Sequence, residues 1–181
     1  MTLHADSDHP PATAPYKAGS EVAVFFDASE LPEDLIAREG KVLSAITAAF
    51  DVWTTHTDIE FVQVADAELA QVRVGFSDTT KANEFAFDGA GGLLAQATTG
   101  SLVFDASEKW TLPGDPPIET DGFWDRVSFD LYTVAVHEIG HVLGMPHSHD
   151  AADVMSPFYL EGRATLSPAD IAAVKALVGN E

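Results

Sequence analysis

Apolar and polar residues alternate in several short stretches of the first hundred residues, and this pattern predicts β-strands. Residues 59–64 and 71–76 alternate most clearly, and residues 21–26 form a further apolar segment of the same length. Such alternation is typical of strands with one buried face. Residues 93–97 and 102–104 are two more short apolar segments. We therefore expect five strands, all of them before residue 105.

Apolar residues at helical spacing predict the first helix, from about residue 31 to residue 54. Pro32 and the acids that follow it suit a helix start, whereas Gly40 weakens the early part of the helix. We expect Trp53 to lie in the core. The apolar residues at this helical spacing are Val42, Leu43, Ile46, Ala49, Phe50 and Trp53.

Two later segments predict two more helices. The apolar run at residues 131–144 forms the second helix, with Ser128 as its expected N-cap. The third starts at Ser167, where a cap residue, a proline and Asp170 follow the order favoured at helix starts. Turn-forming residues dominate 77–92 and 105–127, so we expect both segments to be long loops.

The length and composition indicate a single domain. The chain has 181 residues, of which 46% are hydrophobic, and no run of about 18 apolar residues that could span a membrane. Residues 1–15 contain little that could pack, so we expect a flexible tail at 1–15 and a folded domain at 16–181. Histidines and aspartates in this tail could in principle reach a metal, but a disordered end is the favoured interpretation.

The net charge and the absence of cysteine exclude several functions. Nine basic and 29 acidic residues give a net charge of −20, which disfavours nucleic acid and anionic membranes as partners. The acids suggest a strongly solvated surface, a calcium site, or both. No cysteine is present, so disulfides and cysteine nucleophiles are excluded.

The segment from His137 to Pro157 carries the candidate chemistry. His137 and His141 are four residues apart on the expected second helix, so their imidazoles project from one face roughly 6 Å apart and can bind one zinc ion. Gly144 permits a sharp turn after the helix, and His147 follows as a third ligand. Three ligands leave one position of a tetrahedral zinc open, as in catalytic sites. Glu138 can act beside that position as a general base.

These positions match a known signature. The spacing H-E-x-x-H-x-x-G-x-x-H followed by a Met-turn resembles the metzincin zinc proteases, and Ser148 after the third histidine resembles the matrixins, the matrix metalloproteinase family. The similarity extends over nearly the whole chain from about Tyr16. It includes Val52 and Trp53, Phe87 to Gly89, Met155, Pro157 and Tyr159, and Leu166 to Ile171.

The resemblance implies the fold and the activity. We expect an α+β domain with a twisted five-stranded mixed sheet, one antiparallel edge strand and three helices. The implied activity is that of a secreted, extracellular, monomeric metalloendopeptidase. It would cleave extended protein or peptide substrates with a hydrophobic preference after the scissile bond. No secretory signal is visible in residues 1–15.

The resemblance also implies further site residues. Leu94 and Ala95 match the edge strand that binds substrate, and Pro157 and Tyr159 match the outer wall of the pocket after the scissile bond. Thr133 is expected near the base of that pocket. Met155 matches the apolar Met-turn floor under the zinc. One structural calcium ion is expected on carboxylates and backbone carbonyls of Asp88, Gly89, Gly91, Leu93, Asp105 and Glu108.

Only one zinc is expected. Where the family has the three histidines and the aspartate of a second zinc site, this chain has Lys81, Asn83, Gln96 and Val103. Two other interpretations remain open: an inactive relative that serves as a metal-dependent binding module, and a cytoplasmic peptidase that processes one partner. The presence of Glu138 counts against the first, and calcium dependence would count against the second.

Overall fold

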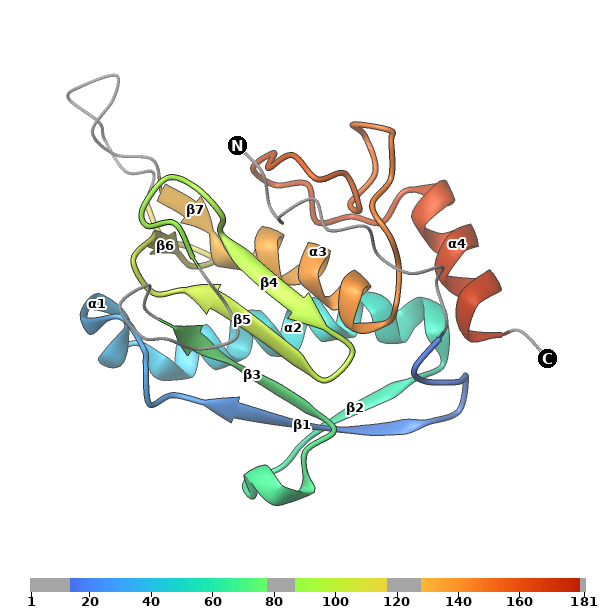
Figure 1. Cartoon of the computed structure of the whole chain (residues 1–181), viewed down its shortest axis with the longest axis horizontal. Coiled ribbons are helices and arrows are strands. Elements are labelled where there is room, and N and C mark those ends of the chain that lie inside the picture. Colours follow the sequence, from blue (N-terminus) through green and yellow to red (C-terminus); the bar gives the residue numbers. More distant parts are fainter. Residues whose placement is uncertain (1–13, 78–86, 117–127, 180–181) are drawn as a thin grey trace.

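The computed structural model describes residues 14–77, 87–116 and 128–179, and its strands build a five-stranded mixed sheet (Figure 1). The order across the sheet is β2-β1-β3-β5-β4, and β4 is the antiparallel edge strand, as expected. The expected strand positions hold to within two residues. The strands are β1 (Glu21–Asp27), β2 (Glu60–Gln63), β3 (Val72–Ser77), β4 (Ala95–Thr98) and β5 (Ser101–Asp105).

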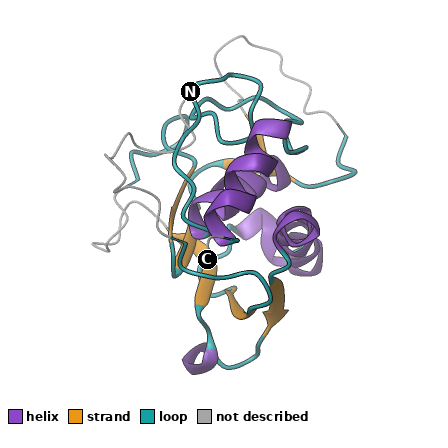
Figure 2. Cartoon of the chain, turned by 90° about the vertical axis from the view of Figure 1, so that its right-hand side faces the viewer, coloured by secondary structure: helices purple, strands orange, loops and turns teal. Residues whose placement is uncertain are grey.

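The long helices lie together beside the strands, since α2 packs against both α3 and α4, whereas a short helical turn lies apart at the bottom of the view (Figure 2). The core fills the space between the layers, where Trp53 and the strand residues Val74 and Phe104 are buried. The helical elements are α1 (Glu33–Ile36), α2 (Glu39–Thr57), the 3-10 turn Ala67–Leu69, α3 (Leu131–Val142) and α4 (Pro168–Val178). In the described part of the chain, no helix is long and apolar enough to cross a membrane.

The expected first helix is in fact two helices, so the prediction of one continuous helix from residue 31 to 54 was wrong. The single turn α1 ends at Ile36, and α2 begins at Glu39 and continues to Thr57. Between them Arg38 leaves the helical region, with φ −121°. Its guanidinium forms an ion pair with Asp115, a contact across 77 positions of the sequence. The described chain therefore has two short helical turns, α1 and the 3-10 turn Ala67–Leu69, beyond the three expected helices.

The segment from residue 105 to 127 is not entirely loop, which corrects a second prediction. Strand β6 (Lys109–Thr111) pairs in parallel with β7 (Ser128–Asp130) in a separate two-stranded sheet. Trp110 is buried in this region, and its indole nitrogen donates a hydrogen bond to the Asp105 carbonyl at 2.9 Å. The pairing joins segments far apart in sequence, so local pattern could not reveal it.

The two remaining predictions concern helix starts, and one of them was wrong. Ser128 lies in β7, and Asp130 caps α3 instead, where its carboxylate accepts a hydrogen bond from the Thr133 amide at 2.6 Å. For α4 the prediction is confirmed. Ser167 and Asp170 form a reciprocal capping box, and Pro168 opens the helix.

Candidate active site

Helix α3 and the turn after it bring three histidines to one point. His137 and His141 lie one helical turn apart on α3, and Gly144 takes φ 91°, a conformation open to glycine at little cost. This turn returns the chain so that His147 faces the helix. The Nε2 atom of His141 lies 3.1 Å from the Nε2 of His137 and 3.1 Å from that of His147. The predicted ligand set therefore forms one cluster.

The hydrogen bonds of the other ring nitrogens show that this cluster suits a metal ion. His137 Nδ1 lies 2.7 Å from the Val154 carbonyl oxygen, and His141 Nδ1 lies 2.8 Å from that of Met145. A carbonyl oxygen only accepts, so both Nδ1 atoms carry the proton and both Nε2 lone pairs face inward. Lone pairs this close repel unless a cation lies between them. Nitrogen atoms around a tetrahedral zinc stand roughly 3.3–3.4 Å apart, close to the observed spacing.

Glu138 follows the first of these histidines on α3. Its side chain is 0% exposed, and burial raises the pKa of its carboxyl well above the usual value. A nearby cation favours the ionised form and opposes this rise. The residue predicted as the base therefore lies in a dry environment beside the ligand cluster, where a carboxylate binds a proton more readily than it does in water.

The floor below the histidines depends on a glycine that the sequence analysis missed. Met155, the predicted Met-turn residue, is buried, and its sulfur lies close to Gly140 of α3. A Cβ added at Gly140 would lie 2.2 Å from the Met155 sulfur and 3.0 Å from Cζ2 of Trp53. Gly140 therefore allows the Met-turn to approach the helix closely. Its signal was available, because a glycine inside an apolar helical pattern usually has a packing reason.

Two aspartates connect the ligand loop to α4, and neither role was foreseen. Asp170 was expected only as a helix-start acid, but its carboxylate also accepts hydrogen bonds from the amides of Val154, at 2.8 Å, and Met155, at 3.3 Å. Asp153 accepts from the hydroxyls of Ser148, at 2.5 Å, and Ser167, at 2.6 Å. These hydroxyl bonds lower the pKa of Asp153. Asp170 is thus linked through Val154 to the orientation of His137.

The candidate substrate residues lie on α3 or on elements that contact it. Strand β4, which contains Ala95, packs against α3, and Leu94 directly precedes it; both side chains are buried. The Thr133 hydroxyl accepts a hydrogen bond from the Gly162 amide at 3.2 Å. The structure therefore places the edge strand and the loop after the Met-turn against the same helix.

The wall residues Pro157 and Tyr159 are partly buried. The Tyr159 hydroxyl accepts a hydrogen bond from the Asp130 amide at 3.0 Å, and its ring packs edge-on against Phe129, with centroids 5.1 Å apart. The far end of the wall is thus fastened to the start of α3.

The calcium candidates form a compact loop cluster. Asp88 accepts from the Leu93 amide at 2.7 Å, and Glu108 accepts from the Gly91 amide at 2.7 Å. Burial raises the pKa of Glu108, and the charges of Asp105 and Asp88 raise it further. The charges of Asp88 and Asp105 therefore both act on Glu108 in this loop, and Gly89 and Gly91, at φ 88° and 92°, curve its backbone. Of the residues named for a second zinc, Gln96 and Val103 are register partners on β4 and β5. Lys81 and Asn83 lie outside the described residues.

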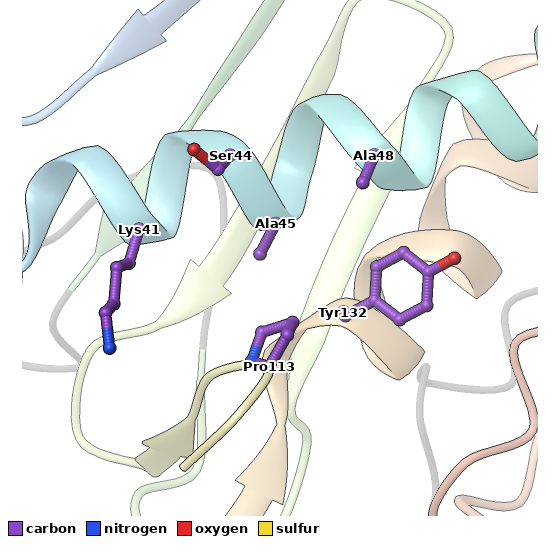
Figure 3. A pocket seen from close by; sticks show the side chains of 6 residues that line it. All are labelled: Lys41, Ser44, Ala45, Ala48, Pro113 and Tyr132. Atoms are coloured by element: carbon purple, nitrogen blue, oxygen red, sulfur yellow. The ribbon is translucent and has the colours of Figure 1, made fainter.

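A separate groove of about 360 Å³ lies between α2 and the start of α3 (Figure 3). Its lining is mostly small or apolar, and none of the lining residues belongs to the ligand cluster, the calcium candidates or the substrate candidates. They are Lys41, Ser44, Ala45, Ala48, Pro113 and Tyr132. The groove therefore has no part in the chemistry of the histidine cluster.

Fold and site together have the features of zinc metalloendopeptidases, and comparison with known proteins specifies the family. The family model for matrixin matches residues 22–179, so the chain belongs to the matrixin family.

Several curated relatives support this membership. The chain is 36% identical to metalloendoproteinase 1 of Glycine max over 144 residues, which cover 75% of this chain and 45% of that protein. It is 39% identical to human matrix metalloproteinase-16 over 127 residues (64% and 19%) and 32% identical to karilysin of Tannerella forsythia over 145 residues (75% and 28%). The chain thus spans less than half the length of these relatives.

Proposed function

We propose that this chain is an active zinc-dependent endopeptidase that hydrolyses peptide bonds of extended protein substrates. The convergence of three histidine Nε2 atoms, two of them with their Nδ1 atoms fixed by carbonyl groups, carries this proposal. His137, His141 and His147 would hold the zinc, and Glu138 would be the general base.

The chemistry follows from the positions of these groups. A zinc ion held by the three imidazoles would supply Lewis acidity to the scissile carbonyl and to a bound water. Glu138 accepts a proton on its carboxylate as the water oxygen bonds to the carbonyl carbon. It then donates that proton to the amide nitrogen, which leaves as an amine when the C–N bond breaks. No covalent enzyme intermediate is required.

The substrate would bind as an added strand along β4, the edge strand with Leu94 and Ala95 at its start. Main-chain hydrogen bonds would give affinity, and one pocket would give selectivity. Thr133, Pro157 and Tyr159 would form the pocket for the side chain after the scissile bond, with a preference for hydrophobic residues. The contact of Thr133 with Gly162 and that of Tyr159 with Asp130 support this pocket, because both join the wall loop to α3.

The remaining assignments extend from the same family membership. We propose a single zinc and one structural calcium ion on Asp88, Gly89, Gly91, Leu93, Asp105 and Glu108. Residues 16–181 would form the catalytic domain of a secreted, monomeric enzyme, and residues 1–15 a tail. The negative charges of Asp88 and Asp105 close to Glu108 support the calcium site. The net charge of −20 supports protein substrates over nucleic acid or membrane partners.

The test compares the parent with Glu138→Ala on casein at equal zinc occupancy. The exposed carboxylate of Glu68 offers a matched control, Glu68→Ala. Loss of the base should slow cleavage by about two or more orders of magnitude, with the control unchanged. Zinc-loaded parent that cuts neither casein nor other unfolded proteins would refute the proposed activity.

A further inference from the structure

The wall segment at residues 156–160 has little regular secondary structure of its own. It contains one isolated bridge residue, Phe158, and no helix. Pro157 has no amide hydrogen to donate. The backbone of such a segment is fixed only if hydrogen-bond donors from other parts of the chain bind its carbonyl oxygens.

Arg163 supplies those donors. One terminal nitrogen of its guanidinium donates to the Ala151 carbonyl at 2.9 Å. The other donates to the Ser156 carbonyl at 3.1 Å and also to the Phe158 carbonyl. One side chain thus holds the carbonyl groups on both sides of Pro157 and ties them to the loop after the third histidine.

The charge and shape of arginine suit this position. The Arg163 guanidinium interacts electrostatically with two nearly buried carboxylates, Asp153 and Asp170. Arginine stays protonated in proteins, and its planar fork presents several donors in fixed directions. A lysine ammonium carries the same charge but cannot reach three carbonyl groups in one plane.

We propose that Arg163 is a positioning residue that fixes the backbone of residues 156–158 and thereby determines which side chain the pocket after the scissile bond accepts. This inference rests on the proposed function, because the pocket has meaning only for a peptidase. The wall is fastened at Tyr159 by Asp130 and on the opposite side by Arg163. Loss of Arg163 removes its bonds to the carbonyl groups of Ala151, Ser156 and Phe158. The contacts of Tyr159 with Asp130 and of Gly162 with Thr133 remain, and the histidines and Glu138 keep their places on their own elements.

The experiment uses the zinc-loaded chain with Arg163→Gln, Arg163→Lys and the matched control Arg73→Gln. Arg73 also donates to a backbone carbonyl, that of Ala67 at 2.9 Å, but on β3. Three peptides differ only in the residue after the scissile bond: leucine, phenylalanine or alanine. In Arg163→Gln the leucine-to-alanine ratio of kcat/KM should fall at least tenfold, mainly through KM. The zinc content of Arg163→Gln should equal that of the parent. The leucine-to-alanine ratio of Arg163→Lys should lie between those of the parent and Arg163→Gln, and the control Arg73→Gln should keep the parent ratio.

Other results would overturn the inference. An equal loss for all three peptides would make Arg163 a general structural residue, and an unchanged ratio would show that the wall does not need it. If Arg163→Gln does not fold, the leucine-to-alanine ratio of Arg163→Lys is compared with that of the parent instead.

A parent that cleaves none of the peptides would refute the proposed function, and amide hydrogen exchange of residues 158–161 then decides the role of Arg163. Faster exchange in Arg163→Gln but not in Arg73→Gln supports the fixed backbone, and unchanged exchange overturns it.

Discussion

Replacement of Asp170 by alanine tests how far the site depends on α4. The Asp170 carboxylate is 2% exposed and accepts hydrogen bonds from the amides of Val154, at 2.8 Å, Ser167, at 2.9 Å, and Met155, at 3.3 Å. The Val154 carbonyl in turn lies against His137 Nδ1 at 2.7 Å. The variant leaves three amide groups without their acceptor and loosens the residue that orients a zinc ligand.

The size of the effect follows from these bonds. A hydrogen bond to a charged group contributes about 1.5–3 kcal/mol, and a buried amide left without an acceptor costs a similar amount. The two shorter bonds therefore contribute about 3–6 kcal/mol together, and the longer bond to Met155 adds little. For a domain of this size, about 1 kcal/mol shifts Tm by roughly 2–4 °C, so Tm should fall by roughly 6–24 °C. Loss of such outer support typically weakens metal affinity about 10–100-fold.

Urea unfolding and a zinc competition titration measure the two effects separately. Asp66→Ala is the matched control, because the Asp66 carboxylate also accepts from one amide, that of Glu68 at 2.9 Å, but at an exposed turn. The free energy of unfolding of Asp66→Ala should fall by about 1 kcal/mol or less, and its zinc affinity should equal that of the parent. A loss in Asp170→Ala no larger than in the control would refute the reasoning, as would an unchanged zinc affinity in a clearly destabilised variant.

Three further predictions concern the floor, the ligand loop and the calcium cluster. Gly140→Ala should destabilise the protein by about 1–3 kcal/mol in urea unfolding, because its Cβ would overlap Met155; a gain from higher helix propensity would contradict this. The pKa of Asp153 is lowered below its usual 3.8 by hydroxyl bonds. Its stabilising effect is therefore full above that value and is lost as the pH falls through the folded pKa. In Asp153→Asn the free energy of unfolding should therefore fall less steeply below about pH 4 than in the parent. Parallel plots of this free energy against pH for the two proteins would refute the prediction. Removal of calcium should lower the Tm of the parent by several degrees but change that of Asp105→Asn little, and equal shifts in both would refute the site.

The sequence pattern was enough to predict those helices and strands that depend on residues close together in the chain. Helix α4 begins where the capping box predicts it, because a cap involves residues only three apart. The five strands of the main sheet follow from short alternating or apolar stretches. Gly40 indicated a weak early part of the first helix, but local pattern did not place the break before α2, where Arg38 forms its ion pair with the distant Asp115. The pairing of β6 with β7 was missed for the same physical reason, since its partners lie far apart along the chain.

The sequence by itself determined which side chains can bind the metal. Two histidines four residues apart on a helix face the same side, and Gly144 permits the turn that returns His147 to them. The tertiary structure decided how these ligands are held. The links from Asp170 through Val154 to His137, and from Arg163 to the carbonyl groups of the wall, join residues whose proximity depends on the path of the loops. Spacing within a helix is set by local geometry, whereas these links form only when the whole core has packed.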